Sequence, residues 1–245
     1  MNTSKDLIRI QIFFLVLFGI AMGFFEAAVV VYLRQLYYPE GFSFPLKIMA
    51  LDELSIEYLR EFSTLIMLFS IAIVAGRNFY ERISYFLLCF GIWDIFYYVW
   101  LKVLLDWPQS LLTWDILFLI PIVWAGPVLV PVICAFTMIV IASMILYFQQ
   151  NGFRVKVMIR EWVLLFLGGF IILITFIWDY LKIVIHGGFL SHIETLGTDP
   201  SFQQAIAGHV PDFFNWYLFM IGESCVLCFL VLFCVRTWKS HVGKR

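Results

Sequence analysis

The sequence predicts an all-α membrane protein, a bundle of six transmembrane helices with one re-entrant or interfacial helix at the outer face. Composition is the first indication, because 63% of the 245 residues are hydrophobic, 13% are charged and the mean hydropathy is +0.95. Soluble domains carry about 25% charged residues. The second indication is that long apolar runs alternate with short polar segments that hold most of the Lys and Arg residues. We expect one integral membrane domain over residues 1–245.

Six apolar runs approach or exceed the length of about 20 residues that a helix needs to cross a bilayer. The first run is longer than the hydrophobic core of a signal peptide, so we expect it to be retained. Within it, Gly19 and Gly23 lie four residues apart and permit close approach of a second helix. The expected spans are residues 8–33, 57–76, 83–105, 127–148, 162–185 and 213–235.

The segment between the third span and Gln149 is too long for one crossing and barely long enough for two. Lys and Arg gather on the cytoplasmic side of membrane proteins. Arg77 and Arg82 precede this region and Arg154 and Arg160 follow it, so an odd number of crossings must separate them. We therefore expect residues 111–124 to form the re-entrant or interfacial outer helix. Both termini are expected in the cytoplasm, in a bacterial-type inner (plasma) membrane.

The third span carries ionisable side chains on one side. At about 100° per residue, Asp94, Tyr97, Tyr98 and Lys102 point in similar directions from a helix. An ionisable group in a transmembrane helix costs at least about 2.5 kcal/mol, and it indicates a functional site. This side of the helix should therefore face protein rather than lipid.

Other spans carry acids at similar depths, which predicts a polar pocket in the outer half of the bilayer. The candidate catalytic residues are its four deep carboxylates, Glu26, Asp94, Asp179 and Glu223. The candidate ligand-binding residues around them are Glu61, Trp93, Tyr97, Tyr98, Lys102, Asp115 and Lys182. The inner halves of the spans are apolar, which disfavours a transport path.

Carboxylates that lie side by side cannot all ionise unless cations balance them. Three hypotheses follow for this pocket. In the first, the acids pair with Lys102 and Lys182, with a contribution from Arg60. In the second, at least one acid stays protonated and donates a hydrogen bond or a proton to a bound amphiphile. Alternatively, a metal ion binds among the acids, as in carboxylate-rich helical bundles. The ligands in that hypothesis are Glu26, Asp94, Asp179, Glu223 and His186.

Several functional classes are disfavoured. The sequence has no Gly-x-Ser-x-Gly, no His-Glu-x-x-His and no glycine-rich phosphate loop. Haem is not expected, because His186 alone lies near a span. Nucleic acid is not expected either, because the basic residues occupy segment ends, as membrane topology requires.

Three functions are left, in order of preference. The first is a membrane-embedded enzyme, with or without a metal, that acts on a lipid or quinone-like amphiphile. The second is a non-catalytic membrane anchor or quinone-binding subunit of a larger respiratory complex, with other membrane subunits as partners. The third is an ion or solute transporter. The 27 Phe, 11 Tyr and 9 Trp residues suit either of the first two, because rings stack on ligands and on neighbouring subunits.

The topology is testable with cysteines introduced at Asn151 and Ser191. If the basic segments are cytoplasmic, a membrane-impermeant maleimide added to intact cells labels position 191 and leaves position 151 unlabelled. The chain without introduced cysteines gives the background. Labelling at position 151 would contradict the predicted orientation.

Overall fold

The computed structural model describes residues 3–120, 122–189 and 199–242. Six of its helices are long and apolar enough to cross a membrane, which confirms the predicted six-helix membrane bundle. These helices are α1 Thr3–Tyr37, α2 Leu51–Ala75, α3 Phe79–Leu105, α4 Leu129–Gln150, α5 Ile159–His186 and α7 Trp216–Val242. Asn151 is exposed just after α4, whereas Ser191 lies outside the described residues.

The predicted outer helix over residues 111–124 is wrong. This segment enters an antiparallel hairpin of β1 Trp114–Phe118 and β2 Trp124–Pro127. Aromatic and β-branched residues such as Trp114, Ile116 and Phe118 favour strands over helix. The hairpin also lets strand backbone groups bond to one another, which non-helical backbone at membrane depth requires.

One short helix was not predicted. Helix α6, Pro200–Ala207, precedes the last span. Its start has favourable residues, because the Asp199 side chain accepts a hydrogen bond from the Ser201 amide at 2.8 Å and Pro200 occupies the first turn.

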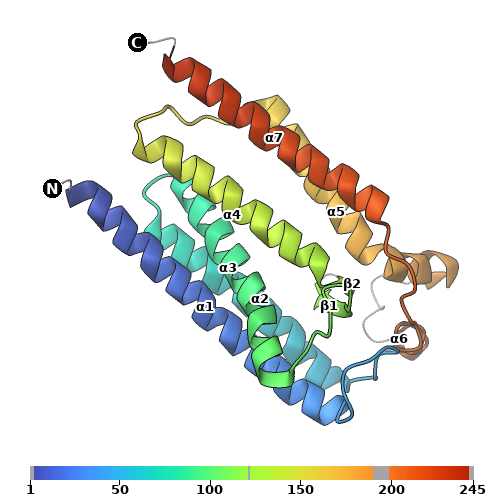
Figure 1. The fold of residues 1–245 in the computed structure, drawn as a ribbon. Helices are drawn as coiled ribbons and strands as arrows, with labels where there is room; N and C mark the ends of the chain where they lie inside the picture. Colours follow the sequence, from blue (N-terminus) through green and yellow to red (C-terminus); the bar gives the residue numbers. More distant parts are fainter. Residues whose placement is uncertain (1–2, 121, 190–198, 243–245) are drawn as a thin grey trace.

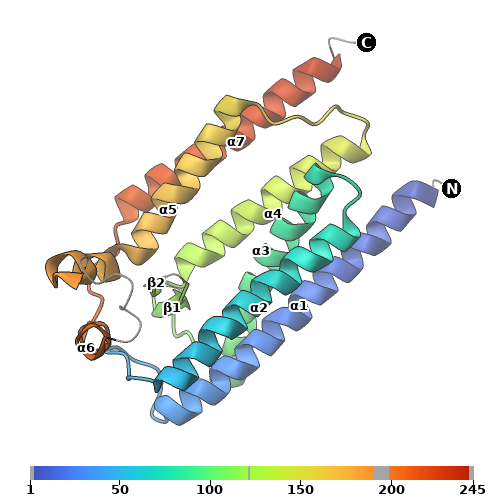
Figure 2. The same cartoon turned by 180° about the vertical axis from the view of Figure 1, so that it is seen from behind.

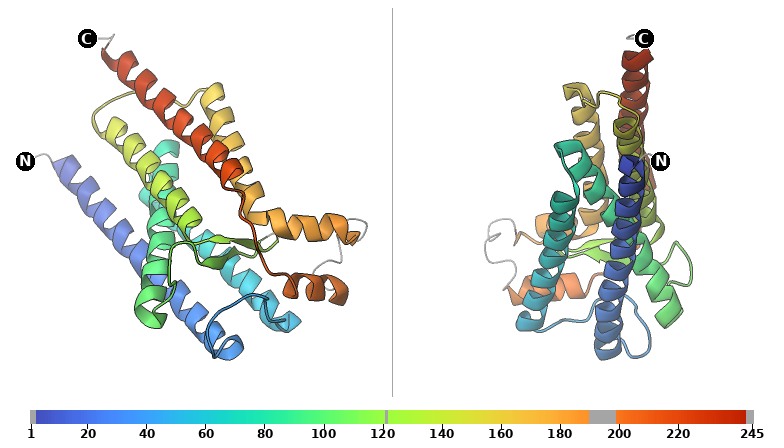
Figure 3. Two further views of the ribbon diagram at one scale, coloured as in Figure 1. Left: turned by 45° about the vertical axis from the view of Figure 1, so that its right-hand side comes forward. Right: turned by 90° about the vertical axis from the view of Figure 1, so that its left-hand side faces the viewer.

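Helix α3 is the centre of the bundle and packs against α1, α2 and α4. Helices α5 and α7 run side by side and form a second layer, which reaches α4 through α7 (Figures 1 and 2). Both termini lie at one end, while the hairpin and α6 lie toward the other (Figures 1 and 3). The hairpin contacts α5 and α4, so it connects the two layers.

Glycines allow the closest helix contacts. A Cβ on Gly23 of α1 would lie 3.0 Å from the Trp93 carbonyl oxygen of α3, which confirms the close approach predicted from Gly19 and Gly23. On the other side of α3, a Cβ on Gly91 would lie 2.6 Å from the Ala135 carbonyl oxygen of α4. Helix α3 therefore has no room for added side-chain atoms at these two contacts.

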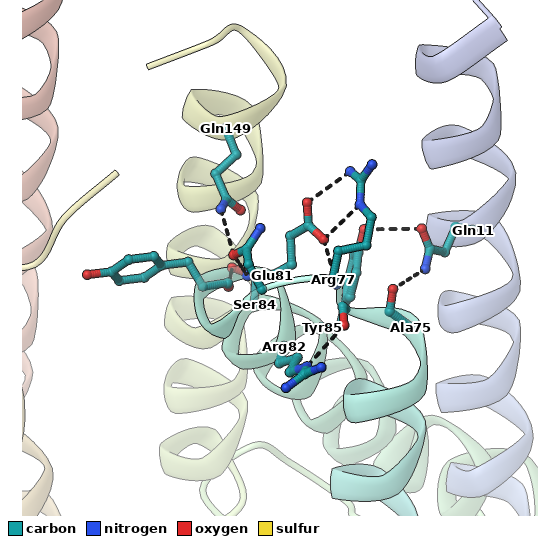
Figure 4. Close-up of polar contacts among 11 residues, drawn as sticks. Gln11, Ala75, Arg77, Glu81, Arg82, Ser84, Tyr85 and Gln149 are labelled. Atoms are coloured by element: carbon teal, nitrogen blue, oxygen red, sulfur yellow. Dashed lines mark hydrogen bonds and ion pairs between the residues drawn. The ribbon is translucent and has the colours of Figure 1, made fainter. Parts of the chain in front are cut away.

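Hydrogen bonds of polar side chains connect the helices at the end that carries the termini (Figure 4). The Gln11 amide of α1 donates to the Ala75 carbonyl of α2 at 2.6 Å, and the Tyr85 hydroxyl of α3 donates to Gln11 at 3.4 Å. The Gln149 amide of α4 donates to Asn78 Oδ1, beside the start of α3, at 3.0 Å. These bonds fix the first four spans at the end far from the hairpin.

The α3–α4 contact can be tested with one added methyl group. We expect Gly91→Ala to lower the free energy of unfolding by about 1–3 kcal/mol, because overpacking forces the backbones apart. The matched control is Gly169→Ala in α5, where a Cβ would meet nothing within 4 Å. Thermal unfolding in detergent measures both, and equal melting temperatures would contradict the close contact at Gly91.

Candidate functional site

A cavity of about 250 Å³ lies in the half of the bundle that holds the hairpin. Its walls come from α1, α2, α3, the hairpin, α6 and the loop between α1 and α2. Nine of the lining side chains are aromatic, among them Tyr58, Trp93 and Phe118. The charged lining residues are Glu26, Arg34, Lys47, Glu57, Arg60, Glu61, Asp94 and Asp115. The cavity is therefore amphipathic, with rings and charges in the same walls.

A buried ion pair joins α1 to the hairpin. Arg34 Nη2, in the last turn of α1, lies 3.0 Å from Asp115 Oδ1 in β1, and the two side chains are 8% and 2% exposed. The Arg34 Cζ also lies 3.7 Å from the ring centroid of Trp107 and 4.6 Å from that of Phe42. Burial raises the pKa of Asp115 to about 6, and the Arg34 guanidinium limits this rise. Oδ2 of Asp115 and Nη1 of Arg34 have no hydrogen-bond partner among the described residues.

A second charge cluster joins α1 to α2. Arg60 binds Glu26 of α1 and Glu57 of its own helix, the latter at 2.7 Å between Nη2 and Oε2. The hydroxyl of Thr64 donates to Glu26 Oε2 at 3.4 Å. Glu61, one turn from Glu57, accepts the Leu119 amide at 2.9 Å, just after β1. Helix α2 thus neutralises Glu26 and also positions the hairpin.

Asp94 differs from the other acids of the cavity. It is partly buried in α3, lines the cavity and makes no hydrogen bond or ion pair with the part of the chain that the structure describes. Asp115 lines the same cavity, so two carboxylates belong to its walls at this place. Beside it, Tyr98 and Trp93 are each 6% exposed, and the Trp93 indole N–H has no partner among the described residues. The rings of Tyr97 and Tyr98 meet edge to face, with centroids 4.9 Å apart.

The structure brings together part of the predicted pocket. The residues that line the cavity are Glu26, Glu61, Trp93, Asp94, Tyr97, Tyr98 and Asp115. These are the predicted members from α1, α2 and α3, together with Asp115 of the hairpin. Their gathering follows from the packing of α3 against α1 and α2, which brings the polar sides of these helices into one space.

The other predicted members of the pocket lie elsewhere, so the prediction that all of these residues share one pocket is wrong. Lys102 is half exposed and pairs with Asp106 at 2.7 Å, and Lys182 pairs with Asp179 at 3.0 Å. Glu223 accepts a hydrogen bond from Thr137 of α4, and His186 is exposed at the end of α5. Helices α5 and α7 pack mainly on each other, so their acids do not reach the cavity.

The predicted metal ligands are also dispersed. Glu26 binds Arg60, and Asp179 binds Lys182 and lies 3.6 Å from His209 Nε2. Within the residues that the structure describes, no group of three or more His, Cys, Asp or Glu side chains is arranged to hold a metal ion. The acids predicted to share one ion, Glu26, Asp94, Asp179 and Glu223 with His186, occupy separate surroundings. The prediction that these five residues bind one metal ion together is therefore wrong.

Sequence reasoning missed Arg34. The first span was expected to end at residue 33, which makes Arg34 a charge in the interface, whereas α1 continues to Tyr37 and buries it. The available signal was Asp115, an acid in an apolar segment that needs a cation from elsewhere in the chain. The contributions of Phe42 and Phe202 to the cavity walls were missed too, because loop and short-helix placement has no periodic signal.

Comparisons with protein-family models, with curated proteins and with solved structures find no match to this chain.

The Arg34–Asp115 pair should carry a large part of the local stability. Arg34→Gln and Asp115→Asn each remove one partner from a buried pair, and we expect each to cost about 3–5 kcal/mol. The double variant should cost clearly less than the two single losses added together, because no unpaired charge is left.

The control is Arg77→Gln, which breaks an ion pair with Glu81 in which the Arg77 side chain is 69% exposed. Exposed pairs contribute up to about 1 kcal/mol, so this variant should stay close to the unmodified protein. Thermal unfolding of the four variants gives the comparison. Additive losses for Arg34 and Asp115 would show that the two side chains act independently.

Proposed function

We propose that the protein is a membrane-embedded enzyme that binds a lipid or quinone-like amphiphile in this cavity and transfers a proton to or from it through Asp94. One observation carries the proposal. Asp94 is a carboxylate in an aromatic cavity of a membrane protein, and it makes no hydrogen bond or ion pair with the described residues. Ionisable groups at such positions are costly and mark functional sites.

The size and lining of the cavity support an amphiphilic ligand. Pockets for small molecules usually have about 300–1,000 Å³, so 250 Å³ suits a polar head group and the first part of a chain. The rest of an acyl or prenyl chain then stays in the bilayer. Apolar side chains such as Ile48 and Leu54 line the same cavity and suit such a chain.

The neighbours of Asp94 support acid–base chemistry. A carboxylic acid that is positioned against a substrate contributes about 10²–10⁴-fold to a rate. Asp115 lines the same cavity, and two carboxylates in one weakly screened space repel each other. Tyr97 and Tyr98 follow Asp94 by one helical turn and provide hydroxyl groups and ring faces to orient a ligand.

The proposal includes an orientation. The α2–α3 and α4–α5 loops lie at the end that holds the termini. Basic residues lie in these loops or just after them, and the positive-inside rule favours the cytoplasm for that end. These residues are Arg77, Arg82, Arg154 and Arg160. The cavity then lies in the outer half of a bacterial-type inner membrane.

Catalysis is tested by incubating the purified protein in vesicles of a total polar lipid extract with added quinones, and profiling all species by mass spectrometry. We expect at least one species to be converted by the unmodified protein. Asp94→Asn should slow this conversion by about 10²–10⁴-fold, because the amide cannot transfer the proton.

Asp106→Asn is the matched control, since it makes the same chemical change at the end of the same helix, where the side chain is 83% exposed. Its rate should equal that of the unmodified protein. Conversion that persists in Asp94→Asn would contradict the role of this residue. Binding without any conversion would favour a non-catalytic quinone-binding or anchoring subunit, and loss of conversion in a chelator would indicate a metal.

A further inference from the structure

We infer that the head group bound in this cavity carries a positively charged amino group, seated between Asp94 and Asp115. The inference rests on the proposed function and narrows its ligand from any amphiphile to an amino-bearing lipid.

The charge balance of the cavity favours a cation. Its lining holds five carboxylates and three basic side chains, a formal charge of −2. A space that is screened less than bulk water makes such an imbalance costly, because charges interact more strongly there than in water. A ligand with one positive charge reduces the imbalance, and an anionic ligand increases it.

The two arginines of the cavity are paired with acids of the protein. Arg34 is paired with Asp115, and Arg60 binds both Glu26 and Glu57. Lys47 is exposed at the edge of the cavity, where its Nζ lies 5.6 Å from the ring centroid of Tyr38. A phosphate or carboxylate head group would therefore meet two guanidinium groups whose charge is already balanced, and among the described residues only the exposed Lys47 is a lining cation without an ion pair.

Two of the acids, in contrast, have oxygen atoms without a hydrogen-bond partner among the described residues. Asp94 makes no hydrogen bond or ion pair within the described residues, and Oδ2 of the 2%-exposed Asp115 has no hydrogen-bond partner among them. An unpaired buried charge costs several kcal/mol, and a protonated amine offers donors to both carboxylates. The rings of Trp93, Tyr97 and Tyr98 lie on the same helix around Asp94, and ring faces attract ammonium groups.

One unpartnered donor refines the ligand. Nη1 of Arg34 is buried without a hydrogen-bond partner among the described residues, although the guanidinium charge is balanced by Asp115. A neutral ester or hydroxyl oxygen can accept from it without adding negative charge. An amino group close to such an oxygen satisfies both features of the cavity.

The test uses photoactivatable probes that share one diazirine-bearing alkyl chain and differ in their head groups. The four head groups are a primary amine, a hydroxyl, a phosphate and a benzoquinone. The full chain is kept in dodecyl maltoside, whose head group is uncharged. Mass spectrometry measures labelling of peptides that contain residues 93–98, relative to peptides around Tyr217, which is 85% exposed on α7 and does not line the cavity.

We expect the amine probe to label the cavity peptides at least about tenfold more than the hydroxyl, phosphate or benzoquinone probes, after division by the α7 reference. Asp94→Asn should reduce this preference about tenfold, whereas Asp94→Glu, which keeps the charge, and Asp106→Asn should retain it. If Asp94→Asn does not fold, the ranking of the probes on the unmodified protein still decides.

The outcomes separate the inference from the proposed function. Cavity labelling by the phosphate, hydroxyl or benzoquinone probe that equals or exceeds that of the amine would overturn the amino head group and still support an amphiphile site. Labelling by all four probes no greater than at the α7 reference would overturn both. Amine preference that Asp94→Asn leaves unchanged would also overturn the inference.

Discussion

The Arg34–Asp115 ion pair is the contact on which the cavity depends. The bilayer core provides no water, so a charge that enters it must be satisfied by other protein groups. Arg34 reaches Asp115 across the boundary between α1 and the hairpin, and Trp107 and Phe42 cover the guanidinium. Because the pair is almost fully buried, removing either partner exposes the other to an apolar environment. The ion pair between these two residues therefore keeps the hairpin next to α1, at the cavity that α1, α2 and α3 line.

The hairpin is the only strand structure in the described part of the chain, and its position follows from the same constraint. Non-helical backbone in a membrane protein must be covered by protein or by a polar cavity. Here β1 and β2 bond to each other, Glu61 of α2 accepts the Leu119 amide, and β2 packs on α5. The segment that was predicted to be a helix is thus a two-stranded hairpin, which contacts helices of both layers.

Features that repeat along a helix could be predicted from the sequence, whereas features that depend on which helices and loops pack together could not. Hydropathy and length predicted the six spans, and the spacing of Gly19 and Gly23 predicted a close helix contact, which α1 makes with α3. Helical spacing placed Asp94 and Tyr98 on one side of α3, and the structure has both in the cavity wall. Glu223 was misplaced because no periodicity shows which helices are adjacent, and α7 packs on α5. The hairpin was misread because a short apolar run suits a strand and a buried helix equally.

The immediate surroundings of each acid explain why Asp94 stands apart. Asp179 has Lys182 three residues away, so its own helix neutralises it. Glu26 and Glu223 have only apolar residues three and four positions away, and other helices supply Arg60 and Thr137 to them. Asp94 likewise has no cation at these spacings, where the chain places Phe90, Gly91, Tyr97 and Tyr98. Asp115 adds a second carboxylate to the lining of the same cavity. Asp94 therefore differs from the other acids in having no partner among the described residues, and our proposals assign its balance to a proton or a bound group in the cavity.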